Sequence, residues 1–235
     1  MHLLTYLQTQ HHLPRRKITD LIKQKKILIN NFPVESFKTP LNENDKITLP
    51  DWTIITYSLT DKKDPQQILL FNKPIGYAIS KSDPHNPTIY QLLPKEYQHR
   101  YYIGRLDKDS RGLVLLTPDP TLVHEYEHPS KQITKTYLVT LNTSLTEQQI
   151  KKAKSWVLSP NDSWKQELLK LQDITKKDLE KSNCYQIILS EGKKRHIRRV
   201  ISALWAKVID LQRIREGNFE LWNLPEWKRK LQKIT

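Results

Sequence analysis

Glycine is scarce in this chain. The 235 residues include only five glycines, at positions 76, 104, 112, 192 and 217. Glycine takes positive φ, and lets backbone approach closely, without the steric cost that other residues incur. A chain that uses so few should keep them where those properties are needed, although a genome biased against glycine would give the same count. The five positions therefore mark candidate turns and functional loops.

The charge balance favours a polyanionic partner. Lys and Arg number 39 against 25 Asp and Glu, which gives a net charge of +14 and a pI near 9.7. Such an excess attracts nucleic acid, and the alternative is a well-solvated surface. The hydrophobic fraction of 37% is enough for a folded core.

Several classes of protein are disfavoured. The single cysteine, Cys184, cannot form an internal disulfide, and the eight histidines are scattered, so no metal site is expected. The first residues lack the pattern of a signal peptide, and no run of about eighteen apolar residues indicates a membrane span. We expect a soluble, cytoplasmic, monomeric protein without a membrane, metal or cofactor requirement.

The N-terminal part has the pattern of a small basic unit. Helices are predicted over 3–10 and 15–26, and strands over 27–29 and 45–49, with a turn at Asn30, Asn31 and Pro33. The second helix has an apolar stripe of Ile18, Leu21 and Ile22 among many cations, which include Arg15 and Arg16. Residues 59–66 are polar and read as a linker.

Strands and helices alternate irregularly after the linker. Strands are predicted over 68–72, 113–117, 133–141, 165–174, 185–190, 208–214 and 219–222. Helices are predicted over 121–127, 146–156 and 194–205, and the last should bury Ile197, Ile201, Leu204 and Trp205. This is a strand-rich α+β pattern rather than a regular βαβ repeat.

The segment 104–117 (GRLDKDSRGLVLLT) is the sharpest local feature. It places two carboxylates, three cations and a hydroxyl between Gly104 and Gly112, and then enters an apolar strand. Such a loop can carry an active site on a rigid strand. It can equally be a polar connection in which Asp107 caps a turn, and the residues alone favour that reading.

This segment resembles the catalytic motif of pseudouridine synthases, in the branch acting on bacterial small- and large-subunit ribosomal RNA. Residues 135–139 (KTYLV) and 191–200 (EGKKRHIRRV) resemble the second and third motifs of that branch, with His196 where glutamine is usual. Residues 73–76 and 213–217 resemble two further segments, so all five glycines lie in matched segments. Pro118 departs from the usual residue after the first motif. The first fifty residues resemble an S4 RNA-binding domain, although Asn31 replaces a common glycine.

The resemblance implies a fold and a division of the chain. We expect a small N-terminal S4-like α/β RNA-binding domain over 1–58 and a linker over 59–66. A mixed, mainly antiparallel-sheet catalytic domain should occupy 67–235.

The resemblance also implies an activity and a site. The chain should flip a uridine out of ribosomal RNA, or of a pre-ribosomal particle, and rejoin its base to the sugar through C5. Asp107 would be the nucleophile or base, Tyr137 the platform for the base, and Arg198 the cation beside Asp107. Ile197 would close the base pocket. The remaining cations, expected on RNA, are Arg105, Arg195, Arg199, Arg15 and Arg16.

Two alternatives remain open. One is a non-catalytic RNA-binding or ribosome-assembly protein on the same scaffold. The other is a pseudouridine synthase that acts on transfer RNA, since only family analogy favours the ribosomal substrate. The sequence identifies neither the target uridine nor the ribosomal subunit.

Overall fold

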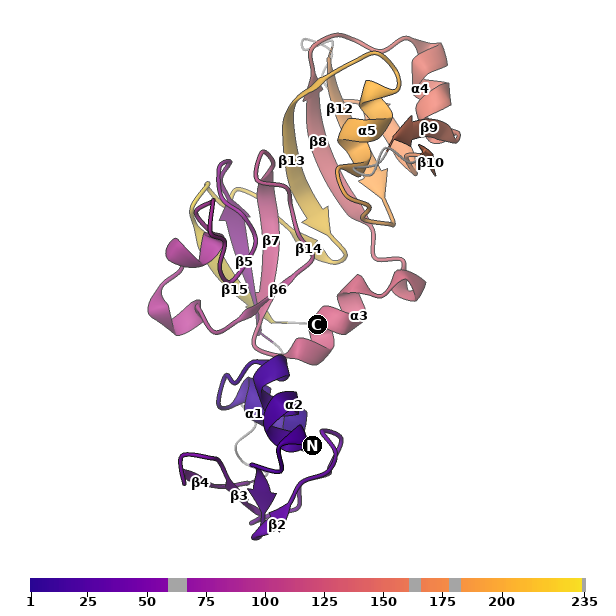
Figure 1. Cartoon of the computed structure of the whole chain (residues 1–235). Coiled ribbons are helices and arrows are strands. Elements are labelled where there is room, and N and C mark those ends of the chain that lie inside the picture. Colours follow the sequence, from indigo (N-terminus) through magenta and orange to yellow (C-terminus); the bar gives the residue numbers. More distant parts are fainter. Residues whose placement is uncertain (59–66, 161–165, 178–182, 234–235) are drawn as a thin grey trace.

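A computed structural model describes residues 1–58, 67–160, 166–177 and 183–233. Figure 1 shows a small N-terminal unit at one end of the molecule and a larger sheet-based part at the other. The predicted linker over 59–66 lies outside the described residues.

The N-terminal unit packs two helices on a small sheet. The helices are α1 (Leu3–Thr9) and α2 (Arg15–Lys23), and the sheet has the order β2-β1-β3-β4. Its strands are β1 (Leu28–Ile29), β2 (Phe32–Pro33), β3 (Lys46–Thr48) and β4 (Ile54–Thr56). Asn30 and Asn31, with φ of +50° and +72°, form the predicted turn between β1 and β2. The unit has its own apolar core, which includes Ile18 and Ile22.

The larger part is built on a nine-stranded sheet with the path β11-β12-β8-β13-β7-β5-β15, to which β6 and β14 add. Every pairing in it is antiparallel except that of β13 with β7, so the predicted mainly antiparallel sheet is confirmed. The strands are β5 (Gln67–Lys73), β6 (Tyr101–Ile103), β7 (Arg111–Thr117), β8 (Lys135–Leu141), β11 (Asp173–Lys176), β12 (Cys184–Leu189), β13 (Val208–Glu216), β14 (Phe219–Glu220) and β15 (Arg229–Lys233).

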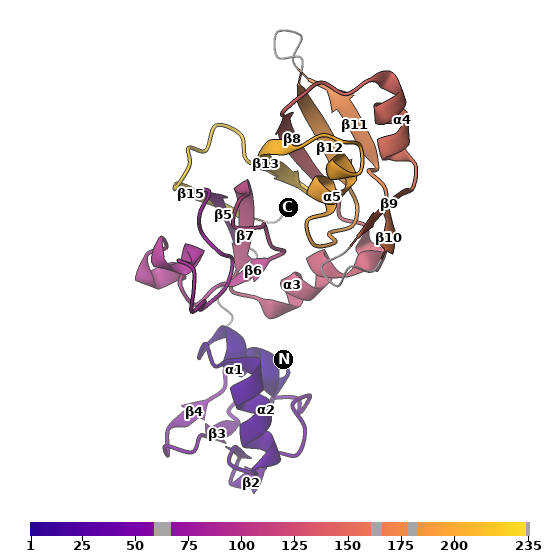
Figure 2. The ribbon, with the colours of Figure 1, turned by 45° about the horizontal axis from the view of Figure 1, so that its top comes forward.

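Helices and one hairpin complete this part. The helix α3 (Pro120–Glu127) lies between the large sheet and the N-terminal unit, and α4 (Glu147–Lys154) and α5 (His196–Ser202) lie together at the far end (Figure 2). The hairpin of β9 (Val157–Pro160) and β10 (Gln166–Leu169) lies beside them. Short 3-10 helices cover Ile89–Gln91, Lys95–Tyr97 and Pro129–Lys131. Thr146 caps α4 through a capping box with Gln149, as its sequence predicts.

Two predicted elements are wrong. The single strand over 165–174 is instead two strands, β10 and β11, in different sheets. The helix over 194–205 ends at Ser202, and Trp205, predicted to be buried, is 93% exposed. The chain turns there because Trp205 takes a left-handed backbone conformation, with φ of +62°. The buried residues of this segment are His196, Ile197, Val200, Ile201 and Leu204.

No helix in the described part of the chain is both long and apolar enough to cross a membrane. Cys184 is buried and carries a free thiol.

Candidate active site

Residues 104–110, which carry Asp107 and Asp109 and are called the acidic loop here, connect β6 to β7. The sheet fixes both ends of this loop. The Ser110 amide donates a hydrogen bond to the Asp107 carbonyl (3.0 Å), so the loop does turn at this residue. The turn uses the backbone of Asp107, while its carboxylate lines a cavity. The Glu127 carboxylate, at the end of α3, accepts a hydrogen bond from the Gly104 amide (2.9 Å). The loop is thus held at both ends by its neighbours.

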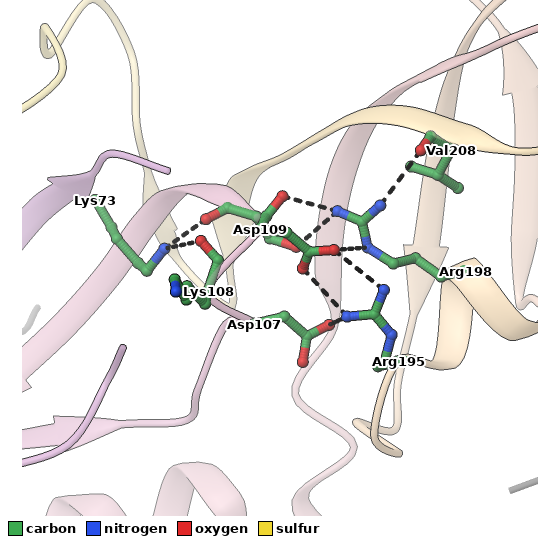
Figure 3. Close-up of polar contacts among 8 residues, drawn as sticks. Lys73, Asp107, Lys108, Asp109, Arg195, Arg198 and Val208 are labelled. Atoms are coloured by element: carbon green, nitrogen blue, oxygen red, sulfur yellow. Dashed lines mark hydrogen bonds and ion pairs between the residues drawn. The ribbon is translucent and has the colours of Figure 1, made fainter. Parts of the chain in front are cut away.

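The side chain of Lys73 contacts the backbone of the loop (Figure 3). Its side chain is fully buried, and its Nζ donates to the carbonyls of Ser110 (2.5 Å), Pro74 (3.0 Å) and Lys108 (3.4 Å). Burial lowers the pKa of Lys73 to about 8, against the opposing charges of Asp109 and Asp107. The predicted motif over 73–76 therefore contributes a buried cation to the acidic loop.

Gly112, the second residue of β7, stands where a side chain does not fit. Its φ is +109°, and a Cβ there would lie 2.3 Å from the Arg213 carbonyl oxygen on β13. Any other residue would push β7 away from β13. This glycine is required for close approach, as its scarcity in the chain suggests.

The arginines are not paired as predicted. Arg198, expected beside Asp107, donates from Nη2 to the Asp109 carbonyl (2.8 Å), and its Nε lies 3.4 Å from the Asp109 carboxylate. Arg195 is the cation that forms an ion pair with Asp107, at 3.9 Å, and it also grips Asp109 through both of its terminal nitrogens (3.1 and 3.2 Å). Figure 3 shows the two guanidinium groups side by side over the loop. Arg195 stands directly before α5 and has a left-handed backbone, with φ of +52°. This backbone conformation directs its side chain toward the loop.

Two opposed effects act on the Asp109 carboxyl. Its partial burial would raise its pKa, but the hydrogen bond from Arg195 and the charges of Arg198 and Arg195 lower it below the usual range. Burial lowers the pKa of Arg198, with Asp109 as the main opposing charge. At neutral pH the loop and the two arginines therefore form a cluster of paired charges.

A cavity of about 910 Å³ opens over this cluster. Of the residues expected in the site, those that line it are Arg105, Asp107, Tyr137, Arg195, Ile197 and Arg198. Tyr137 is 7% exposed and Ile197 is 4% exposed, and burial raises the pKa of the Tyr137 hydroxyl. Both residues contribute apolar surface to the lining of the cavity. His196, where glutamine is usual in the related branch, is also a buried lining residue, and burial lowers its pKa.

A second set of charges lies beside Tyr137, whose partner on the neighbouring strand β13 is Arg213. Arg213 is buried and donates from Nε to the Leu113 carbonyl (2.7 Å), and its Nη2 lies 3.2 Å from Glu216. Lys135 lies 3.6 Å from the same glutamate. These residues stand in segments that resemble family motifs, yet sequence reasoning gave them no role. Burial of charge is the signal that identifies them, and it requires the structure.

Three of the expected RNA-binding arginines lie elsewhere. Arg199 is ion-paired with Glu167 (2.8 Å) and does not line the cavity. Arg15 and Arg16 lie exposed on α2, in the N-terminal unit. Arg15 borders a separate cavity of about 710 Å³, which reaches the large part of the chain through His99 and Tyr101.

No metal site is seen in the residues that the structure describes: nowhere there do three His, Cys, Asp or Glu side chains gather as ligands.

Comparisons with known proteins agree on one family. A family profile described as RNA pseudouridylate synthase matches residues 67–203. "Ribosomal small subunit pseudouridine synthase A" of Haemophilus influenzae is 30% identical over 210 residues, which cover 89% of this chain and 85% of the relative. "Ribosomal large subunit pseudouridine synthase B" of Buchnera aphidicola is also 30% identical, over 211 residues. These cover 88% of this chain and 82% of that relative.

A solved structure adds the fold. It is described as "Crystal structure of pseudouridylate synthase" and is 28% identical to this chain. The two structures superpose with a TM-score of 0.65 over 99% of this chain and 96% of the solved one. The fold and the matches together define an RNA-modifying enzyme. The chain belongs to the RNA pseudouridylate synthase family.

Proposed function

We propose that this protein isomerises a specific uridine of ribosomal RNA to pseudouridine, with Asp107 as its essential carboxylate. The observation that carries the proposal is the position of Asp107, on a loop fixed by two strands, in a cavity that also contains Tyr137 and Arg195. The cavity, of about 910 Å³, has room for one nucleotide that has left its stack.

The reaction needs access to the junction between base and sugar. The bond between N1 and C1′ breaks, the uracil turns, and C5 bonds to C1′. The proton on C5 is lost, and N1 gains one, so no atom or electron is gained or lost overall. A carboxylate at this junction can act as a nucleophile or as a base. Asp107 has that role, and Arg195 forms an ion pair with it at 3.9 Å.

The base needs an apolar surface on which to turn. The ring of Tyr137 gives the uracil an aromatic face, and Ile197 closes the pocket from α5. Arg198 holds the acidic loop in place through Asp109. Arg105 is an exposed cation at the cavity, positioned for a phosphate of the displaced strand.

The Asp107→Asn variant tests the chemistry. We expect it to abolish pseudouridine formation and to retain most RNA binding, since the fold and the cations are unchanged. Asp119→Asn is the matched control, because Asp119 caps α3 away from the cavity and asparagine caps equally well. Full turnover by Asp107→Asn, or RNA binding without turnover by the unaltered protein, would refute the proposal. The second outcome would favour a non-catalytic RNA-binding or ribosome-assembly protein.

We propose ribosomal RNA, met in the cytoplasm, as the substrate because relatives are named for both ribosomal subunits. Identity of 30% to each leaves the choice of subunit open. Pseudouridine mapping in total RNA, from cells with and without the gene, tests this. Loss of a ribosomal position is the expected result, and loss of a transfer RNA position alone would contradict it.

We also propose that residues 1–58 form an S4-like RNA-binding domain, joined by 59–66 to a catalytic domain over 67–235. A separate apolar core and the exposed cations Arg15 and Arg16 support it. Removal of residues 1–58 should weaken binding to long RNA and flatten the dependence of affinity on salt. Unchanged affinity and unchanged salt dependence would refute this role.

A further inference from the structure

The first inference concerns Asp109, and it rests on the proposed function. The carboxylate of Asp109 accepts two hydrogen bonds from Arg195, of 3.1 and 3.2 Å. The ion pair between Arg195 and Asp107 is longer, at 3.9 Å. The guanidinium fork of Arg195 is therefore occupied by a carboxylate next to the candidate catalytic one.

A phosphate group competes for the same fork. Carboxylate and phosphate both accept the bidentate hydrogen bonds of arginine, with similar geometry. The side chains of Arg195 and Asp109 are 41% and 48% exposed, so a phosphate reaching the cavity can approach their contact. Arg198 contributes less to such an exchange, because its side chain is only 13% exposed and also donates to the Asp109 carbonyl.

We propose that Asp109 is a positioning residue that holds Arg195 over the cavity until a phosphate of the RNA strand takes its place. The exchange makes binding selective, because RNA must displace an internal anion at this position. It also keeps Arg195 oriented toward Asp107 before RNA arrives.

A double-mutant cycle on RNA affinity tests the exchange. The variants are Asp109→Asn, Arg195→Gln and the two combined, each in the Asp107→Asn background so that turnover does not interfere. Asp109→Asn should tighten binding of the target RNA several-fold, and this gain should disappear when Arg195→Gln is also present. Arg195→Gln alone should reduce the slope of log affinity against log salt by about one.

Each outcome has a distinct meaning. An equal gain with and without Arg195 would show that Asp109 only repels RNA at a distance, and would overturn the proposal. Weaker binding by Asp109→Asn would show a structural role and would also overturn it. These measurements concern affinity alone, so they stand apart from the turnover test of the proposed function.

A second, independent inference concerns the tryptophans. Four of them, Trp52, Trp205, Trp222 and Trp227, have left-handed backbone, with φ of +63°, +62°, +46° and +67°. Their side chains are 82%, 93%, 80% and 47% exposed. A bulky residue with positive φ is an outlier that needs an explanation. At Trp52, Trp205 and Trp222 burial of the indole ring does not offset this strain. The ring of Trp227 packs edge-on against Tyr77, with the ring centroids 5.3 Å apart.

Two of the four stand where glycine ends a helix or a turn. The amide of Trp205 bonds the Ser202 carbonyl (3.0 Å) and that of Ala206 bonds the Ile201 carbonyl (3.2 Å), which is the Schellman pattern after a helix. In a Schellman motif the residue with left-handed backbone, here Trp205, is usually glycine. Trp52 closes the turn Leu49-Pro50-Asp51-Trp52, through its amide to the Leu49 carbonyl (3.0 Å). Turns of the type x-Pro-Asp-Gly have glycine at that last position.

The other two stand at the centres of turns. Trp227 is the third residue of the turn from Pro225 to Lys228, closed by a bond of 3.1 Å. Positive φ at the third residue is the mark of a type II turn, which favours glycine there. Trp222 is the second residue of the turn from Leu221 to Leu224, also closed at 3.1 Å, and positive φ at that place favours glycine as well.

We infer that these four are glycine positions, and that the protein made in its own cell carries glycine there. A codon that one genetic code reads as tryptophan and another as glycine would give this pattern, and UGA is such a codon among bacteria. With glycine at these four positions the chain has nine glycines instead of five. Exposed aromatic rings can instead serve as stacking platforms for RNA bases, which is the competing explanation.

Two measurements test the inference. The gene should have UGA at the four positions, and peptides of the protein from its own cells should have the mass for glycine. Tryptophan in those peptides would overturn it. In recombinant chain, each Trp→Gly change should raise Tm by about 2–4 °C, whereas Trp→Ala, which keeps a Cβ in the left-handed region, should gain less.

Trp156 supplies the matched control. It is 55% exposed but is not among the residues with positive φ, so Trp156→Gly should not raise Tm. A lower Tm for all four glycine variants, or a loss of RNA affinity with each, would overturn the inference in favour of stacking platforms.

Discussion

Lys73 makes the stability of this protein depend on pH in an unusual direction. Burial lowers its pKa from the ordinary 10.5 to about 8. The folded chain therefore binds this proton less tightly than the unfolded chain does. Between about pH 8 and 10.5 unfolding takes up a proton at this site, so stability rises with pH across that window. Most lysines that gain an acidic partner have the opposite effect.

The size of the effect follows from the two pKa values. A pKa shift of one unit corresponds to about 1.4 kcal/mol. Between about pH 7.5 and 9.5 the buried ammonium should account for a gain of about 2 kcal/mol in the free energy of unfolding. In Lys73→Met the gain should be absent, because methionine has no proton to bind. The carbonyls of Ser110 and Pro74 would also lose their donor, which makes the variant less stable at every pH.

Urea unfolding at several pH values measures this. The quantity to compare is the difference in the free energy of unfolding between wild type and Lys73→Met at each pH, since all other ionisable groups are common to both. Lys108→Met is the control: Lys108 is exposed, and its loss should leave the wild-type pH dependence in place. A difference that stays constant across the window would refute a lowered pKa at Lys73.

Three further substitutions test close packing and charge pairs in and near the site. Gly112→Ala should cost about 3 kcal/mol of stability, because its Cβ would lie 2.3 Å from the Arg213 carbonyl oxygen. Gly76→Ala is the control and should cost about 1 kcal/mol, because a Cβ there meets no atom within 4 Å. Urea unfolding measures both free energies. Arg199→Gln should lower Tm slightly and leave the salt dependence of RNA binding unchanged, because this arginine already pairs with Glu167; a lower salt slope would contradict this. Glu216→Gln should lower the free energy of unfolding by about 3–5 kcal/mol, because it leaves Arg213 buried without its charged partner. Glu220→Gln, in the exposed pair with Arg215, should lower it by at most about 1 kcal/mol. Equal losses in the two variants would contradict this prediction.

Local signals in the sequence predicted much of the fold. The turn at Asn30 and Asn31, the cap at Thr146 and the buried strand after Gly112 are all present. Such features depend on a few neighbouring residues, so a single sequence contains them. The strand β15 (RKLQK) was not predicted, since its residues are polar and largely exposed. It forms because β5 offers it a row of backbone partners, which only the tertiary structure supplies.

The site was predicted in its parts but not in its pairings. Resemblance to known motifs singled out Asp107, Tyr137 and Arg198, and all three line one cavity. The sequence could not tell which arginine faces Asp107, because that depends on the left-handed backbone of Arg195 before α5. The predicted helix continued past Ser202, and its periodicity would bury Trp205. In the structure the helix ends in a Schellman turn, which leaves Trp205 exposed. Both errors arise where a residue other than glycine takes positive φ.

The buried charges beside Tyr137 explain how distant motifs keep a common geometry. Glu216 on β13 contacts Arg213 (3.2 Å) and Lys135 (3.6 Å), and a Cβ at Gly104 would lie 3.3 Å from the same carboxylate. One buried glutamate thus contacts β8 and lies against the start of the acidic loop. A buried charge that loses a partner is far more costly than an exposed one, so these contacts must form together or not at all. The acidic loop and the strand that carries Tyr137 are thereby fixed relative to each other before any RNA enters the cavity.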